Sequence, residues 1–280
     1  MKTRILTAIG MAVIGIPILI FSEYIIFAVL LSLLTLFALF ETFRALGLEG
    51  HLVICAPAYI MGLAFPILCY YLIEAHTFGI ILIGAAALFV YLMYAFTVAV
   101  FNKGALKFNE ISEAFTVACY VIFSFGSISI MRYMEPDIGL YYIILMLVCA
   151  WGSDVFAYFT GRLFGRHKLI PEVSPKKTVE GAVGGIVCAG GLAMLYGLIV
   201  SSFTELVPNY IVLAVCGVVL AAFSQVGDLI ASLLKREHGI KDYGNIFPGH
   251  GGVMDRFDSI LAIATVLMAI CILLPPFTAA

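Results

Sequence analysis

Long uninterrupted apolar runs are the feature that most limits what this chain can fold into. The segment "IILIGAAALFVYLMYAFTVAV", residues 80–100, contains no charged residue, and several other segments resemble it. A helix of about 20 residues crosses the ~30 Å hydrocarbon core of a bilayer. Strands of membrane β-barrels alternate polar and apolar residues, whereas this run is apolar on every side. The runs therefore predict an all-α polytopic integral membrane protein.

The composition supports lipid as the surrounding solvent. Hydrophobic residues make up 63% of the chain and charged residues only 11%, against roughly 25% charged residues in ordinary soluble domains. A water-soluble protein this apolar would lack the polar groups to cover its surface. The seven cysteines fall inside apolar runs without a CxxC pattern, so we expect buried small side chains rather than a metal or redox centre; they are Cys55, Cys69, Cys119, Cys149, Cys188, Cys216 and Cys271.

The spacing of the runs predicts about nine transmembrane helices in a single integral membrane domain. We expect residues 1–108 to form a helical scaffold and residues 109–280 to form the catalytic part. No clear small-residue cleavage site follows the first run, so we expect a retained helix rather than a secretory signal. The expected helices are Ile5–Phe21, Tyr24–Phe43, Leu52–Ile73, Phe78–Val100, Ala114–Met131, Ile138–Phe159, Gly181–Ser201, Tyr210–Ile230 and Ser259–Leu274.

The basic residues predict the orientation. With nine helices and a cytoplasmic N-terminus, Arg132 is the only basic residue on the outer side, which agrees with the positive-inside rule. This arrangement puts the C-terminus outside. The remaining 14 of the 15 basic residues then lie inside: Lys2, Arg4, Arg44, Lys103, Lys107, Arg162, Arg166, Lys168, Lys176, Lys177, Lys235, Arg236, Lys241 and Arg256.

Two inside loops, Thr160–Gly181 and Leu234–Asp258, are longer and more polar than the others. Loops of this length in a tightly threaded protein are usually functional. We therefore expect the two loops to form the active site.

The second loop ends in "GHGGVMDRFDS", where Asp255 and Asp258 lie in the first turn of an expected helix. The helix dipole favours carboxylates there, and this alone accounts for one aspartate. It does not account for His250, Gly251 and Gly252. Paired glycines let backbone N–H groups approach a ligand closely, and helix N-termini bind phosphate. The stretch therefore predicts a phosphate site.

The helix before this loop carries Asp228 at its membrane end, where an unpaired carboxylate is costly. Two interpretations stay open: an Asp–Lys pair that joins two helices, or a carboxylate that faces a polar cavity and binds a cation. Asp228 and Asp255 together offer the hard oxygens that Mg²⁺ prefers. A spacing of four, seven and eight residues places three further polar residues on the helix face of Asp228; they are Ser232, Lys235 and Arg236.

The first loop contains "VSPKKTVEG", which supplies hydroxyl and ammonium groups directly before a helix. These groups suit phosphate binding, although topology also demands a basic inside loop. Upstream, Asp154, Tyr158 and Arg162 share one helix face. An aspartate inside an apolar helix is a functional-site candidate, with pairing to Arg162 or a nearby lysine as the alternative. The candidate phosphate donors of the loop are Ser174, Lys176, Lys177 and Thr178.

The segment Ser232–Asp258, "SLLKREHGIKDYGNIFPGHGGVMDRFD", resembles the signature of the phosphatidate cytidylyltransferases, also called CDP-diacylglycerol synthases. It has the family's Ser, Lys-Arg, Lys-Asp, apolar-Pro, His-Gly-Gly and Asp-Arg-x-Asp elements in order. The segments "WGSDVFAYFTGRLFG" and "SPKKTVEG" are similar to the family as well, except that Val179 stands where an aromatic residue is common. The resemblance is firm over residues 151–258.

The resemblance implies a nucleotidyltransferase that converts CTP and phosphatidic acid to CDP-diacylglycerol and pyrophosphate. It implies a homodimer that depends on Mg²⁺, with K⁺ as a second cation, and no nucleic acid as a partner. Asp228 and Asp255 match the family's metal-binding carboxylates, and we expect Lys177 and Lys235 to join them in catalysis. The expected substrate-binding residues are Ser174, Lys176, Thr178, Ser232, Arg236, Lys241, His250, Gly251, Gly252, Arg256, Asp154 and Asp258.

Two other classes of protein share some of these features. A transporter or channel also places charged residues inside helices, but it would put them near the bilayer midplane, in repeated halves. Another membrane phosphotransferase would carry a DGxxAR-type motif, which this sequence lacks. The compact chain without a targeting extension favours a bacterial inner membrane, with the active site facing the cytoplasm.

Overall fold

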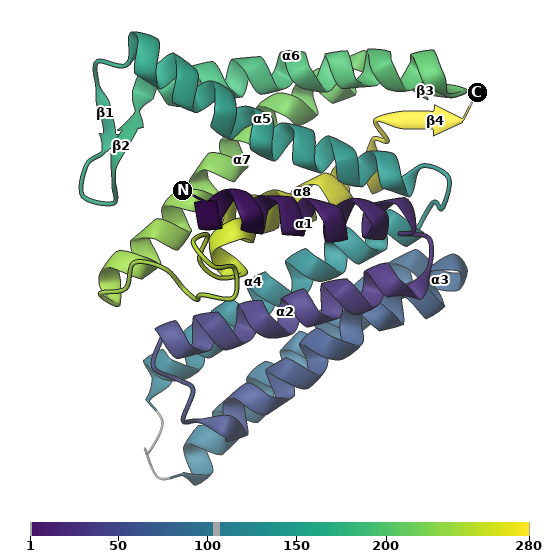
Figure 1. The fold of residues 1–280 in the computed structure, drawn as a ribbon. Coiled ribbons are helices and arrows are strands. Elements are labelled where there is room, and N and C mark those ends of the chain that lie inside the picture. The colour runs from purple at the N-terminus through teal and green to yellow at the C-terminus, as the bar shows by residue number, and fades with distance from the viewer. Residues whose placement is uncertain (1, 103–106, 280) are drawn as a thin grey trace. The chain divides into compact units, whose positions relative to one another are not determined.

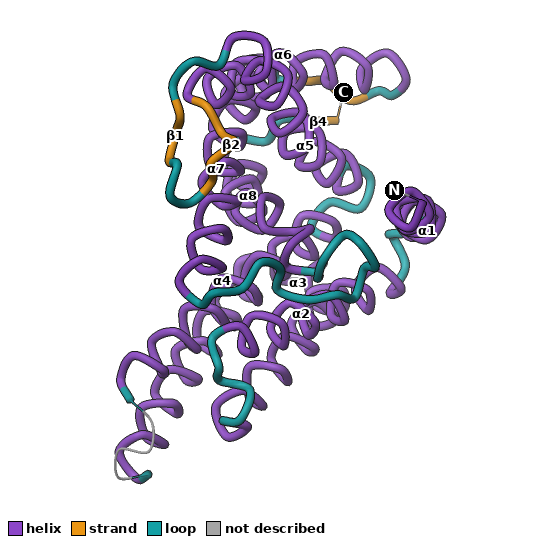
Figure 2. Tube along the Cα trace, turned by 60° about the vertical axis from the view of Figure 1, so that its left-hand side comes forward, coloured by secondary structure: helices purple, strands orange, loops and turns teal. Residues whose placement is uncertain are grey.

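The computed structural model describes residues 2–102 and 107–279, without the side chains of residues 2–6, 8 and 74–76. Helices dominate this part of the chain, and the few strands are short (Figures 1 and 2). The all-α prediction is confirmed. The elements are α1 (Lys2–Ile20), α2 (Ile25–Ala45), α3 (Leu52–Phe101), α4 (Phe108–Tyr133), α5 (Gly139–Phe164), β1 (Lys168–Ile170), β2 (Ser174–Thr178), α6 (Val179–Phe203), β3 (Leu206–Pro208), α7 (Tyr210–Glu237), α8 (Met254–Leu273) and β4 (Phe277–Ala279).

Helix α3 is two antiparallel spans rather than one rod. At 1.5 Å per residue, a straight helix would separate Val53 from Tyr94 by about 60 Å. Instead the Tyr94 hydroxyl donates a hydrogen bond to the Val53 carbonyl at 3.2 Å. The chain therefore folds back between the spans Leu52–Ile73 and Thr77–Phe101, close to the two helices that the sequence predicts.

Eight of the helical segments in the described residues are long and apolar enough to cross a membrane. They are α2, the two halves of α3, and α4 to α8, and the apolar part of α1, Ile9–Ile20, is shorter. The prediction of a polytopic membrane protein with about nine helices is thus confirmed. Lys103, one of the basic residues used for the orientation, lies outside the described residues.

The chain divides into two compact units, each described by itself. The first unit contains residues 1–136 and 238–257, and the second contains residues 137–237 and 258–280. Each expected functional loop thus belongs largely to one unit: the hairpin of β1 and β2 to the second, and the segment before α8 to the first.

Packing in the first unit depends on close approach between α3 and α4. A methyl group on Gly126 or Gly84 would overlap the ring of Phe65, so these glycines let the ring fit between helices. At one end of α4, Arg132 is buried. It donates a hydrogen bond from Nε to the Ser22 hydroxyl at 2.7 Å and another from Nη1 to the Pro136 carbonyl at 3.0 Å. A buried guanidinium held in this way avoids much of its desolvation cost.

Packing in the second unit brings α5, α6 and α7 into contact around Gly185. A methyl group there would overlap the Ser153 carbonyl oxygen and the Gln225 side chain. Small residues allow such close contact between membrane helices. Because the helices are so close, Gln225 Nε2 donates hydrogen bonds to Ser153 Oγ at 3.0 Å and to the Ala182 carbonyl at 3.1 Å. This network fixes the helix turn that precedes Asp228.

Candidate functional site

The second unit contains a cavity of about 360 Å³ at the helix ends next to the β1–β2 hairpin. Three elements supply its charged groups: α5, β2 and α7. Five of the expected catalytic and substrate-binding residues line it, together with Arg162, Tyr158 and Gln225. The five are Asp154, Lys176, Lys177, Thr178 and Asp228.

Lys177 and Asp228 form an ion pair across this cavity. The distance from Lys177 Nζ to Asp228 Oδ2 is 2.6 Å, and the two side chains are 26% and 31% exposed. The two charged groups attract each other, but their angles do not meet those of a hydrogen bond, and Lys177 Nζ has no hydrogen-bond acceptor among the described residues. Ser232 Oγ donates a hydrogen bond to Asp228 Oδ1 at 3.5 Å. Asp228 therefore pairs with a lysine of β2 rather than of a second helix, and it lines a polar cavity; its binding of a metal cation stays a prediction.

Further charged groups lie close to this pair. The carboxylates of Asp154 and Asp258 both interact electrostatically with Asp228, and Lys235 offsets part of the charge on Asp258. Asp258, inside the second turn of α8, accepts a hydrogen bond at Oδ1 from the Ser259 amide at 2.7 Å. Arg162 Nη1 donates to the Tyr158 hydroxyl at 3.1 Å, which confirms that these residues share a face of α5.

The acidic side chains at this cavity are candidate ligands for a metal cation. No three His, Cys, Asp or Glu side chains in the described part of the chain are grouped to hold a metal ion by themselves. Mg²⁺, however, is usually held by one or two carboxylates, with substrate phosphates and waters completing the shell. Asp228 and Asp154, which line the same cavity, fit that donor set.

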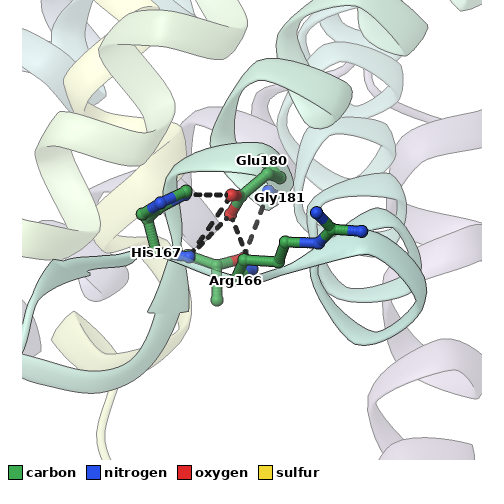
Figure 3. A network of polar contacts seen from close by, with 5 residues as sticks. Arg166, His167, Glu180 and Gly181 are labelled. Carbon is green, nitrogen blue, oxygen red and sulfur yellow. Dashed lines mark hydrogen bonds and ion pairs between the residues drawn. The ribbon is translucent and has the colours of Figure 1, made fainter.

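The β1–β2 hairpin positions Lys176 and Lys177, and Glu180 braces its base (Figure 3). Glu180 accepts hydrogen bonds from the backbone amides of Arg166 and His167, and its Oε1 contacts His167 Nδ1 at 2.6 Å. Thr178 caps α6, because its hydroxyl accepts a hydrogen bond from the Gly181 amide. The sequence pattern "KKTVEG" thus folds into a strand, a helix cap and a first-turn carboxylate.

Replacing Glu180 by Ala should loosen this base. Loss of its hydrogen bonds should make local opening of this segment roughly fivefold more frequent. Hydrogen–deuterium exchange at Arg166 and His167 should accelerate by about that factor. Glu172→Ala, an exposed residue between the two strands, is the matched control. Equal acceleration in both variants would contradict the bracing role.

The remaining candidates from the first loop and α7 lie around this cavity without lining it. Ser174 begins β2 and pairs with Ile170. Arg236 is exposed in the last turn of α7, and Lys235 is half-buried beside it.

The first unit contains a separate polar basin of about 600 Å³, formed by the segment before α8. Lys241, His250, Gly251 and Arg256 line it, as do Asp242 and Asn245. His250 Nδ1 is buried and has no hydrogen-bond partner among the described residues. The two cations and this imidazole make the basin suited to an anionic ligand.

A tight turn shapes the basin. The His250 amide donates to the Phe247 carbonyl at 2.8 Å, with Pro248 and Gly249 in the central positions. Gly249 has φ +77°, as a type II turn demands of its third residue. The Phe247 amide then donates to the Gly251 carbonyl at 2.9 Å, which closes the loop. The glycines of this stretch therefore serve the turn geometry first.

Asp255 closes the same segment from the start of α8. Its Oδ2 accepts hydrogen bonds from the Tyr243 amide at 2.7 Å and from the Gly252 amide at 3.0 Å. The Gly252 N–H, predicted to approach a phosphate, is thus used by Asp255. Asp255 belongs to the first unit and Asp228 to the second, so their joint role as metal ligands stays a prediction.

Sequence reasoning missed three groups that hold these sites. Gln225 joins the helices of the second unit. In the first unit, Arg44 Nη2 donates to the Tyr243 carbonyl at 2.8 Å, and the Met254 amide donates to Glu41 at 3.0 Å. The signal for Glu41 was available, since a carboxylate within an apolar helix is a functional candidate by the same rule as Asp154.

Comparison with known proteins bears on the chemistry of these sites. The model of the Cytidylyltransferase family matches residues 2–274. A phosphatidate cytidylyltransferase of Bacillus subtilis is 36% identical over 267 residues, which cover 94% of this chain and 94% of that protein. Proteins of the same name from Staphylococcus epidermidis and Staphylococcus haemolyticus are 35% and 33% identical over 270 residues, or 95% of this chain and 97% of each relative. The chain therefore belongs to the Cytidylyltransferase family and is a nucleotidyltransferase enzyme.

Proposed function

We propose that this protein is a phosphatidate cytidylyltransferase, which converts CTP and phosphatidic acid to CDP-diacylglycerol and pyrophosphate in phospholipid synthesis. The observation that carries the proposal is the cavity of the second unit, where Lys177 and Asp228 pair 2.6 Å apart beside Asp154 and Arg162. Cations and hard anionic oxygens side by side suit a reaction between two phosphates. The names of the relatives agree with this assignment.

In the proposed reaction, a phosphate oxygen of phosphatidic acid attacks the α-phosphorus of CTP. A new O–P bond forms there, and the bond to the β-phosphate breaks, so that pyrophosphate leaves with the electron pair. The second pKa of a phosphomonoester is about 6, so the attacking group is already largely ionised near neutral pH. The reaction therefore needs little help from a general base.

The main obstacle is repulsion between two anions. At ~4 Å and an effective dielectric constant of ~20, each pair of unit charges contributes about 4 kcal/mol. Lys176, Lys177 and Arg162, which line the cavity, offset this repulsion by binding the phosphates. Fixed charges that stabilise the developing transition state act in the same direction.

We also propose that Mg²⁺ takes part, with Asp228 as a ligand and Asp255 as the second ligand indicated by the family resemblance. When bound, the ion would neutralise phosphate charge and polarise the α-phosphoryl group. Asp154 would support Asp228 by adding negative charge beside it. A K⁺ ion as second cation and a homodimeric assembly are proposed on the resemblance alone.

The test of the reaction uses the purified full-length protein in detergent. Labelled CTP, phosphatidic acid and Mg²⁺ should yield CDP-diacylglycerol, and omission of phosphatidic acid should abolish the product. Chelation of the divalent cation should stop the reaction, with recovery on adding Mg²⁺. Absence of product over a range of metals and detergents would overturn the proposal.

We further propose that the site faces the cytoplasm from the inner membrane, because 14 of the 15 basic residues fall on one side in the nine-helix topology. A reporter fused after Ala280 should then read as periplasmic or extracellular. A reporter fused before Met1 should read as cytoplasmic. A cytoplasmic signal from the C-terminal fusion would contradict the nine-helix topology.

A further inference from the structure

Glu41 is a buried carboxylate that the proposed chemistry does not use. It lies near the C-terminal end of α2, a helix that is otherwise almost wholly apolar, and it is 1% exposed. Taking a carboxylate out of water costs several kcal/mol unless its partners compensate. A residue kept at such a cost within an apolar helix calls for a specific role.

The backbone of the segment that carries the polar basin packs closely against Glu41. Its Oε2 accepts a hydrogen bond from the Met254 amide at 3.0 Å. The carboxylate also fills the space that a side chain at Gly244 or Gly252 would need, because a methyl group at either position would overlap its oxygens. A glycine is therefore needed at position 252 to make room for the Glu41 carboxylate, whether or not its backbone also contacts a ligand.

A second side chain of α2 holds the other end of the same segment. Arg44, one helical turn after Glu41, donates from Nη2 to the Tyr243 carbonyl at 2.8 Å. The Tyr243 amide in turn donates to Asp255. The last turn of α2 thus contacts the segment 243–254 at both of its ends. All of these groups belong to the first unit.

Stability alone is a poor reason for this arrangement. Glu41 Oε1 is buried without a partner at hydrogen-bonding geometry among the described residues, although the Val253 amide interacts with the carboxylate. Asp255 also repels Glu41 electrostatically. Well-packed apolar residues often replace such buried charges with no loss of stability. The carboxylate is better explained by the backbone geometry that it imposes on the glycine-rich segment.

We propose that Glu41 is a positioning residue for nucleotidyl transfer. It acts through the backbone of Gly252 and Met254, and so holds Arg256, His250 and Asp255 in the arrangement that binds the anionic substrate. This inference rests on the proposed cytidylyltransferase activity. It gives α2 a role in substrate binding, although the sequence predicts that residues 1–108 form only a helical scaffold.

Three variants of the full-length protein test the role. Glu41→Ala leaves the Met254 amide without an acceptor, and should raise the KM for CTP or for phosphatidic acid and lower kcat/KM by about 30-fold. Glu41→Gln keeps the shape and one acceptor oxygen, so it should stay within about fivefold of wild type. Glu49→Gln, at an exposed position just beyond α2, should not differ from wild type. Simple destabilisation would reduce the active fraction, and with it kcat, but would leave KM unchanged.

A size exchange between Gly252 and Glu41 supplies a test of the contact itself. Gly252→Ala should lose activity because its methyl group meets the carboxylate. Adding Glu41→Asp shortens the side chain by one methylene and withdraws the carboxylate. The double variant should therefore be at least about tenfold more active than Gly252→Ala alone. If the double variant is no better than Gly252→Ala, or if Glu41→Ala leaves the KM of both substrates unchanged, the proposal is overturned.

Hydrogen–deuterium exchange separates this inference from the activity on which it rests. Exchange over residues 243–254 should accelerate in Glu41→Ala and not in Glu49→Gln, and it needs no turnover. An inactive wild type with accelerated exchange in the variant would overturn the proposed reaction but support the anchoring of the segment. Unchanged exchange in a folded Glu41→Ala protein would overturn the inference, whatever the activity.

Discussion

Asp228→Asn is expected to lower the conversion of CTP and phosphatidic acid by about a thousandfold or more. The substitution keeps the volume of the side chain but removes the charge that pairs with Lys177 at 2.6 Å and one of the two oxygens offered to Mg²⁺. Loss of charge stabilisation worth several kcal/mol gives a factor of this size. The measurement is the steady-state rate with labelled CTP at saturating Mg²⁺.

The matched control is Asp137→Asn, an exposed aspartate just before α5 in the same unit, which should keep wild-type rates. The melting temperature of each variant in detergent shows whether the protein is folded. A folded Asp228→Asn protein with a wild-type rate would remove Asp228 from the metal site. The ion pair with Lys177 would then be a contact between α7 and β2 alone.

The helices could be predicted from the sequence because the bilayer imposes a length and a polarity on each of them. The two spans of α3 were predicted as separate helices for this reason. Their ends were less well predicted: α7 continues to Glu237 rather than ending at Ile230, and α8 begins at Met254 rather than Ser259. Hydropathy marks the segment that tolerates lipid, whereas backbone hydrogen bonding continues into the polar ends.

Candidate site residues were predictable where a pattern is local. The i, i+4 spacing placed Asp228 beside Ser232, and Tyr158 beside Arg162, as the hydrogen bonds confirm. The partner across the chain was not predictable. Nothing in the spacing indicates that Lys177 pairs with Asp228, or that Glu41 accepts from an amide 213 residues away. Such contacts follow from helix packing, which depends on glycines such as Gly185 whose neighbours only the fold reveals.

Asp255 has two roles that a single substitution can separate. Its Oδ2 accepts the amides of Tyr243 and Gly252, which is a structural role, and the family resemblance makes it a metal ligand as well. Asp255→Asn keeps an amide oxygen that can accept both N–H groups but removes the negative charge. Asp255→Ala removes the acceptor too, leaving two buried amides unsatisfied at about 1–3 kcal/mol each.

If the carboxylate serves the chemistry, Asp255→Asn should lose about a thousandfold in rate while the Gly252 amide stays protected from exchange. Asp255→Ala should lose both the rate and the protection. Glu113→Gln, an exposed carboxylate on α4 in the same unit, is the control for both measurements. A wild-type rate in Asp255→Asn would leave Asp255 with the structural role alone. The search for a second metal ligand would then move to Asp154 and Asp258, whose carboxylates already interact with Asp228 in the second unit.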